Sequence, residues 1–243
     1  MSGFKLHNLP HVSASSINSW VYSKEQWCLQ YLFKQKTSRN AAMMRGVVVE
    51  DAIVSILSGT APEDEAIKSA IVSYNRELMF SNDKNLCSER ENIPHMVRQG
   101  VAALGIYGKP DPAPEGARHK QHKVEVLCRT ENWSVPVIGY LDLKYDAHKF
   151  IFDLKTTNKL PEDMPAAHRR QAAIYAFAVP DCDVVFQYLS ADGTISHQID
   201  NVAAEMAAIK SILIEMEAFL STSNDKEKLL ETIQSEKAAR QAV

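Results

Sequence analysis

Hydrophobic and polar residues alternate along residues 137–157, on both sides of a short polar segment at residues 146–149. Such alternation is typical of two short strands joined in a half-buried hairpin. One face of this hairpin carries apolar side chains from both strands, namely Leu141, Leu143, Phe152 and Leu154. The pattern therefore predicts a tight turn at 146–149 and a hairpin with one core-facing side.

The other face of the hairpin is polar. A turn centred within residues 146–149 places Asp142 opposite Asp153, and Lys155 shares the face of Asp153 because side chains two residues apart point the same way. Facing side chains begin roughly 5 Å apart, which implies about 3 kcal/mol of repulsion between two carboxylates at an effective dielectric near 20. A divalent cation between them would turn this repulsion into binding. The hairpin alone leaves open a solvated face with an Asp–Lys pair.

Helical and strand patterns alternate along the rest of the chain. The helical periods lie at residues 13–33, 43–57, 63–80, 94–107, 166–179 and 202–220, with Pro94 in the first turn of its helix. Further strands are expected at 122–129, 183–189 and 194–199, and residues 221–243 form a charged helix or tail. We therefore expect one α/β domain over residues 1–220, with a mixed central sheet flanked by helices. A helical insertion at about 63–107 precedes the core strands, and strand 122–129 joins the hairpin in an antiparallel run of three.

Four short motifs follow one another along residues 13–190. They are Ser-rich SASSINSW followed by Cys28 and Tyr31; Gly46 and Glu50 in RGVVVEDAI; GYLD ending at Asp142 with FDLKTT from Phe152; and Gln171 with Tyr175 in RRQAAIYAFA. In this order they resemble the PD-(D/E)XK nuclease superfamily, most closely its RecB-type exonuclease branch. Each motif is weak alone, and the resemblance depends on their order.

The resemblance implies a restriction-endonuclease-like fold and metal-dependent hydrolysis of DNA phosphodiesters, with exonuclease preferred over endonuclease. Asp142, Asp153 and the backbone carbonyl of Leu154 would hold Mg²⁺ or Mn²⁺, and Glu50 would complete the ligand set directly or through water. Lys155 would orient the attacking water or offset negative charge. Gln171 and Tyr175 would position the DNA strand, and the pathway would be recombination, repair or phage DNA processing.

The net charge of −3 is not typical of a general nucleic-acid binder. A nuclease can nevertheless concentrate positive charge in one groove. The candidates for DNA contact are Lys120, Lys123, Arg169, Arg170 and Thr156.

The four cysteines, Cys28, Cys87, Cys128 and Cys182, are scattered and form no C-x-x-C motif. Zinc and disulfide frameworks are therefore poorly supported. Some RecB-type relatives bind an iron–sulfur cluster through one early and three late cysteines. Cys28 stands at the early position but no late cluster follows, so we expect a packed core residue and no iron–sulfur cluster.

No apolar run reaches the length of a membrane span, and no secretory signal is visible. We expect a cytoplasmic protein of a bacterial or phage-infected cell, without a membrane partner. The sequence contains no G-x-x-x-x-G-K-[ST] motif, so a recombination or helicase partner would be another chain.

Three alternatives remain open from the sequence. The first is a non-catalytic DNA- or protein-binding module on a nuclease-like fold, which the acidic balance favours slightly. The second is a structure-specific endonuclease, and the third is a metal-dependent hydrolase of a smaller phosphoester. The intact set of Glu50, Asp142, Asp153 and Lys155 argues against a site that has lost its activity.

Overall fold

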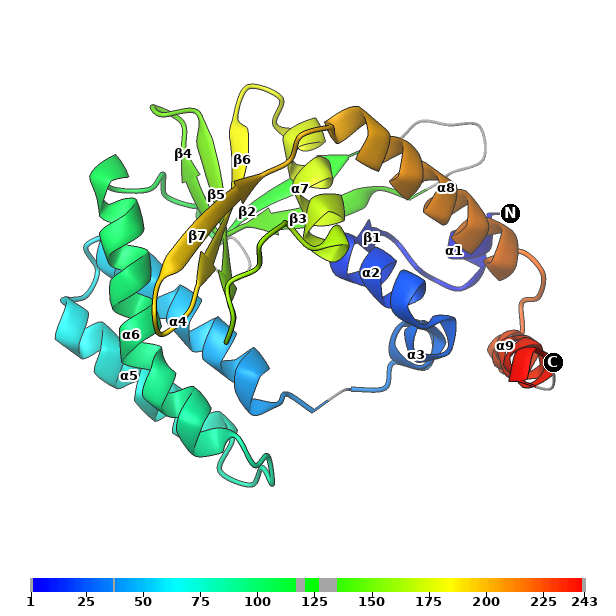
Figure 1. Ribbon diagram of the computed structural model, residues 1–243. Helices are drawn as coiled ribbons and strands as arrows, with labels where there is room; N and C mark the ends of the chain where they lie inside the picture. Colours follow the sequence, from blue (N-terminus) through cyan, green and yellow to red (C-terminus); the bar gives the residue numbers. More distant parts are fainter. Residues whose placement is uncertain (1, 37, 117–120, 127–134, 242–243) are drawn as a thin grey trace.

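The protein is an α/β structure in which helices flank mixed β-sheets (Figure 1). The computed structural model describes residues 2–36, 38–116, 121–126 and 135–241. Its strands are β1 (Val12–Ser13), β2 (His122–Val126), β3 (Val137–Leu141), β4 (Leu143–Tyr145), β5 (Phe150–Thr156), β6 (Asp183–Leu189) and β7 (Thr194–Gln198). Its helices are α1 (Gly3–Leu6), α2 (Ala14–Tyr22), α3 (Lys24–Trp27), α4 (Ala41–Leu57), α5 (Glu63–Glu77), α6 (Leu86–Leu104), α7 (Ala166–Ala178), α8 (Val202–Leu220) and α9 (Lys226–Gln241). The described residues also form a π-helix (Cys28–Leu32) and a 3₁₀ turn (Gly105–Tyr107).

The described strands form two sheets that meet at a bend in the chain. One has the order β1-β3-β2 and the other β4-β5-β6-β7. Both are mixed, because β1 runs parallel to β3 and β5 parallel to β6, whereas the other neighbours are antiparallel. Strand β3 ends at Leu141 and β4 begins at Leu143, so Asp142 lies at the bend. The expected single run of three antiparallel strands is thus divided between two sheets.

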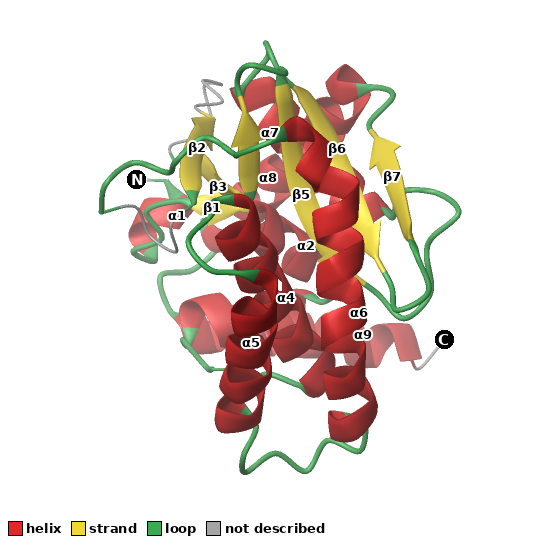
Figure 2. Ribbon diagram, turned by 90° about the vertical axis from the view of Figure 1, so that its left-hand side faces the viewer, coloured by secondary structure: helices red, strands yellow, loops and turns green. Residues whose placement is uncertain are grey.

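Two apolar cores cover the two faces of β5. Ile151 packs in one core with α2, α7, α8 and the start of α9. Phe152 and Leu154 pack in the other core with α4, α5 and α6. Figure 2 shows these three helices on one side of the sheet. Because both faces of β5 are covered and both its edges are paired, this strand of the hairpin is internal, whereas β4 lies at the edge of the sheet.

Side-chain caps begin several of these helices. The Ser13 hydroxyl accepts a hydrogen bond from Ser16 N at 3.2 Å, and Asn40 accepts one from Met43 N at 2.8 Å. The helix expected over residues 13–33 is interrupted, because Ser23 is extended and caps a separate α3. A Ser side chain that bonds nearby backbone competes with helix continuation in this way.

The predicted start of a helix at Pro94 was wrong, because α6 begins at Leu86 and Pro94 lies in its interior. Proline there removes one backbone hydrogen bond. The adjacent Ile93, Met96 and Val97 are fully buried against the core beside α4. This burial keeps the helix continuous, since tertiary packing supplies most helical stability in proteins.

The C-terminal segment is helical as α9 and lies beside α3. Leu229 and Ile233 are buried in the core that also contains α8. None of the described helices is long and apolar enough to cross a membrane.

Candidate active site

The hairpin brings Asp142 and Asp153 together as the alternation predicts. Leu143 pairs with Phe152 in the antiparallel register, and the same register places Asp142 opposite Asp153. Asp142 Oδ2 accepts a hydrogen bond of 2.9 Å from Leu154 N. The Asp142 carboxylate is therefore held on the backbone of β5.

Asp153 and Lys155 form a buried ion pair on the face of β5 that turns toward α7. Asp153 is only 1% exposed, and its Oδ2 contacts the Lys155 ammonium. Within the described residues, this Oδ2 makes no hydrogen bond of good geometry. The partner of this oxygen is therefore the charge of the Lys155 ammonium. A solvated hairpin face is excluded.

Helix α7 contributes Gln171 and Tyr175 to the same cluster. Gln171 Nε2 donates to Asp153 Oδ1 at 2.9 Å and to the Tyr175 hydroxyl at 2.7 Å. The Tyr175 hydroxyl donates to the Tyr140 carbonyl at 2.6 Å. Tyr175 is buried, so it positions Gln171 against β3 and its ring is not available to stack on a DNA base.

Gly139, the glycine of the GYLD motif, leaves room for the ring of Tyr175 on α7. A Cβ at Gly139 would lie 2.4 Å from Cε1 of Tyr175, far closer than packed atoms approach. Two motifs about 35 residues apart are thus parts of a single contact between β3 and α7.

Glu50 reaches the cluster from α4, next to Asp142. A side chain that the sequence did not single out, Gln121, lies between them. Gln121 Nε2 donates to Glu50 Oε1 at 2.7 Å and to Asp142 Oδ1 at 2.8 Å. The only sequence signal for Gln121 is a polar residue just before an expected strand.

Burial and mutual repulsion shift the acid–base equilibria of this cluster. Burial and the charge of Asp153 raise the pKa of Glu50 to about 7. Burial, Asp153 and Glu50 raise the pKa of Asp142 well above its usual range. Burial lowers the pKa of Lys155, but the charges of Asp153 and Asp142 outweigh it, so the net shift is upward. The site therefore concentrates negative charge around one ammonium group.

These shifts predict that the metal-free protein loses stability as the pH rises. An acid whose pKa is raised on folding stabilises the folded state. This stabilisation is fully present below the pKa of the unfolded state and is lost as the pH rises through the pKa of the folded state. For Glu50 the stability is expected to fall between pH 4.5 and about pH 7. One group changes the free energy of unfolding by at most about 1.4 kcal/mol per pH unit. We expect Glu50→Gln to flatten the decline, measured by urea unfolding in EDTA between these pH values. The exposed control Glu91→Gln should keep the wild-type slope, and an unchanged slope in Glu50→Gln would contradict the prediction.

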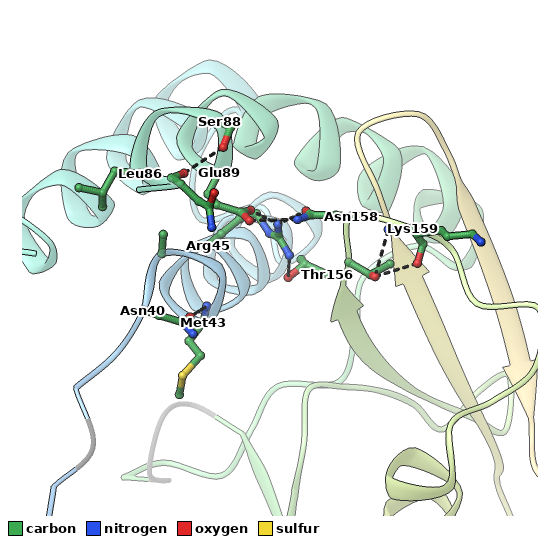
Figure 3. Close-up of polar contacts among 12 residues, drawn as sticks. Asn40, Met43, Arg45, Leu86, Ser88, Glu89, Thr156, Asn158 and Lys159 are labelled. Carbon is green, nitrogen blue, oxygen red and sulfur yellow. Dashed lines mark hydrogen bonds and ion pairs between the residues drawn. The ribbon is translucent and has the colours of Figure 1, made fainter. Parts of the chain in front are cut away.

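A second buried ion pair joins α4, which carries Glu50, to α6 (Figure 3). Arg45 of α4 and Glu89 of α6 are 2% and 4% exposed, and they form a direct ion pair. Asn158 Nδ2 donates to Glu89 Oε1 at 3.0 Å, and Arg45 Nη2 donates to Thr156 Oγ1 at 3.4 Å. These contacts join α4 and α6 to the end of β5, immediately after Lys155.

A groove of about 980 Å³ opens onto Glu50, Asp142 and Gln121. It runs between α4, α5 and the proline-rich residues 110–116. Its lining includes six carboxylates, from Glu50, Asp51, Glu65, Asp111, Glu115 and Asp142. The described lining residues include no Lys or Arg, so the described part of this groove attracts cations.

The residues predicted to contact DNA mostly have protein partners. Lys123 pairs with Glu125, Arg169 with Glu205 and the Met164 carbonyl, Arg170 with Asn18, and Thr156 with Arg45. Lys120 lies outside the described residues. DNA contact by these residues stays a prediction.

Cys28 is a packed core residue, as predicted, and burial raises its pKa to about 12. Cys182 is buried and Cys87 exposed, and both are free thiols. Cys128 lies outside the described residues.

Comparison with known proteins gives only distant likenesses. No known protein family and no curated protein matches the chain. Among solved structures, the crystal structure of SSO0001 is 14% identical, covers 73% of this chain and 86% of its own, and has a TM-score of 0.39. Rai1 of Scheffersomyces stipitis, solved with (3'-NADP)+ and calcium ion, is 11% identical, covers 91% and 73%, and has a TM-score of 0.30. Likeness at this level assigns neither a fold family nor a function.

Proposed function

We propose that this chain is a metal-dependent deoxyribonuclease with a restriction-endonuclease-like core, acting as an exonuclease. One observation carries the proposal. Glu50, Asp142, Asp153 and Lys155 come from α4, the β3–β4 bend and β5, and they meet in one cluster bordered by Gln171. Three carboxylates that repel one another are costly to bury unless a ligand needs them.

The donor set fits Mg²⁺ or Mn²⁺. Both ions prefer carboxylate, carbonyl and water oxygens, and the carboxylates of Asp142 and Asp153 are ligands of this kind. Asp142, Asp153 and the Leu154 carbonyl would hold the ion, with Glu50 binding directly or through water. When bound, the ion would lower the pKa of a water and offset charge on the phosphate.

The other residues of the cluster have roles that do not depend on the ion. Lys155 keeps its charge beside Asp153, so it can orient a water or stabilise negative charge on a phosphate oxygen. Gln171 holds the Asp153 carboxylate in place, and Tyr175 holds Gln171. The described part of the groove beside Glu50 is acidic, so we place the DNA on the side of Lys155 and α7.

End-labelled linear DNA and closed circular DNA, incubated with Mg²⁺ or Mn²⁺, test the proposal. We expect loss of linear DNA alone, abolished in Asp153→Asn, with the position of the label giving the polarity. Cutting of circles by the wild type but not by Asp153→Asn would identify a structure-specific endonuclease instead. Cutting that persists in Asp153→Asn would exclude this site.

A non-catalytic DNA- or protein-binding module is the second candidate, and one observation favours it. Among the described residues, no three His, Cys, Asp or Glu side chains are gathered closely enough to hold a metal ion as they stand. A protein that shifts DNA in a gel, cuts neither substrate and shows no Mn²⁺ binding by calorimetry would be this module.

A further inference from the structure

Gln121 occupies the place where a cation would bridge Glu50 and Asp142. It lies just before β2, outside every motif that defines the candidate site, and it lines the acidic groove beside both carboxylates. Its two hydrogen bonds, 2.7 and 2.8 Å long, run from one nitrogen to one oxygen of each carboxylate. A neutral amide therefore links two groups that would otherwise repel each other.

The chemistry of the amide explains why it suits this place. An NH₂ group carries two hydrogens, and here each is donated to a different carboxylate. Hydrogen bonds to charged acceptors are stronger than those between neutral groups. An apolar side chain at this position would leave Glu50 and Asp142 facing each other without a donor.

The same contacts oppose metal binding. The amide occupies Glu50 Oε1 and Asp142 Oδ1, and Asp142 Oδ2 already accepts from Leu154 N, so a cation that bridges these two carboxylates competes with the amide for their oxygens. The carboxylates as they stand enclose the amide and do not form a three-ligand site. The carboxylates are thus arranged around the amide, and they would have to adopt a second arrangement to bind a metal.

We propose that Gln121 is an internal competitor of the divalent cation: it stabilises the metal-free cluster and sets the metal affinity of the site. The inference rests on the proposed function, since it takes Glu50 and Asp142 as metal ligands. In this role Gln121 is a positioning residue, and the cation displaces it by entering from the acidic groove.

Mn²⁺ calorimetry and thermal unfolding of the EDTA-treated full chain test this role. The variants are Gln121→Met, which removes the donor at similar length, and Gln121→Asn, which keeps the amide but is too short to bridge. Gln198→Met, the same change at an exposed position of β7, is the control. We expect both Gln121 variants to bind Mn²⁺ about tenfold more tightly, the equivalent of roughly one hydrogen bond to a charged group. They should also unfold at a lower temperature without metal and reach the wild-type temperature with saturating Mn²⁺.

The outcomes test competition by Gln121 separately from the proposed nuclease activity. Equal or weaker Mn²⁺ binding by the variants, with normal binding by the wild type, would overturn competition and leave the nuclease proposal standing. Failure of the wild type to bind Mn²⁺ at all would overturn both. If Gln121→Met does not fold, Gln121→Asn decides the matter by the same titration.

Discussion

Replacing Lys155 by methionine should lower the rate of the proposed DNA hydrolysis by about 10²–10³, the usual effect of removing one preorganised charge-stabilising donor. The ammonium is placed by its contact with Asp153 and by the Phe186 ring, whose centre lies 5.2 Å away. Methionine has nearly the same length but carries no charge, so it preserves the apolar packing and removes the ammonium from Asp153. Single-turnover cleavage of linear DNA at saturating Mn²⁺ measures the change in the chemical step.

The matched control for this change is Lys159→Met. Lys159 lies four residues further along and is exposed. It should leave the cleavage rate within a factor of about two, because exposed charges are screened by solvent. Equal losses in both variants would mean that general attraction of DNA, and not charge beside Asp153, explains the effect. An unchanged rate in Lys155→Met would remove Lys155 from the mechanism.

The central hairpin could be predicted because its signals are local. Strand residues alternate between faces with a period of two, and a tight turn fixes the register of the two strands it joins. The positions of Asp142, Asp153 and Lys155 relative to one another follow from these two facts alone. The span of β6, which equals the expected strand at 183–189, depends on a local pattern in the same sense.

The remainder of the site depends on contacts between distant segments. Nothing near Gln121 in the sequence indicates that it meets Glu50, which is 71 residues away. The fit of Gly139 against Tyr175 and the pairing of Arg45 with Glu89 likewise appear only when helices dock on strands. The error at Pro94 has the same origin, because burial of neighbouring side chains outweighed a local helix-start signal.

The Arg45–Glu89 pair gives the largest expected effect on stability. Arg45→Met leaves the Glu89 charge buried without its partner, and Glu89→Leu does the same to Arg45. Each single change should lower the free energy of unfolding by about 3–5 kcal/mol, measured by urea titration. The exposed pair of Arg98 and Glu63, 54% and 40% exposed, also joins two helices. Arg98→Met should therefore cost less than about 1 kcal/mol.

The double variant Arg45→Met/Glu89→Leu separates stability from positioning. Removing both charges leaves no unpaired buried ion, so most of the lost stability should return, since apolar replacements of buried ion pairs are often neutral or stabilising. Arg45 also holds Thr156, and Glu89 holds Asn158, so the double variant still releases the end of β5 from α4 and α6. We therefore expect a stable protein with weakened Mn²⁺ binding, because Glu50 on α4 is no longer aligned with Asp142. Additive destabilisation would show that the two charges act independently, and full Mn²⁺ affinity in a stable double variant would show that the pair does not position the site.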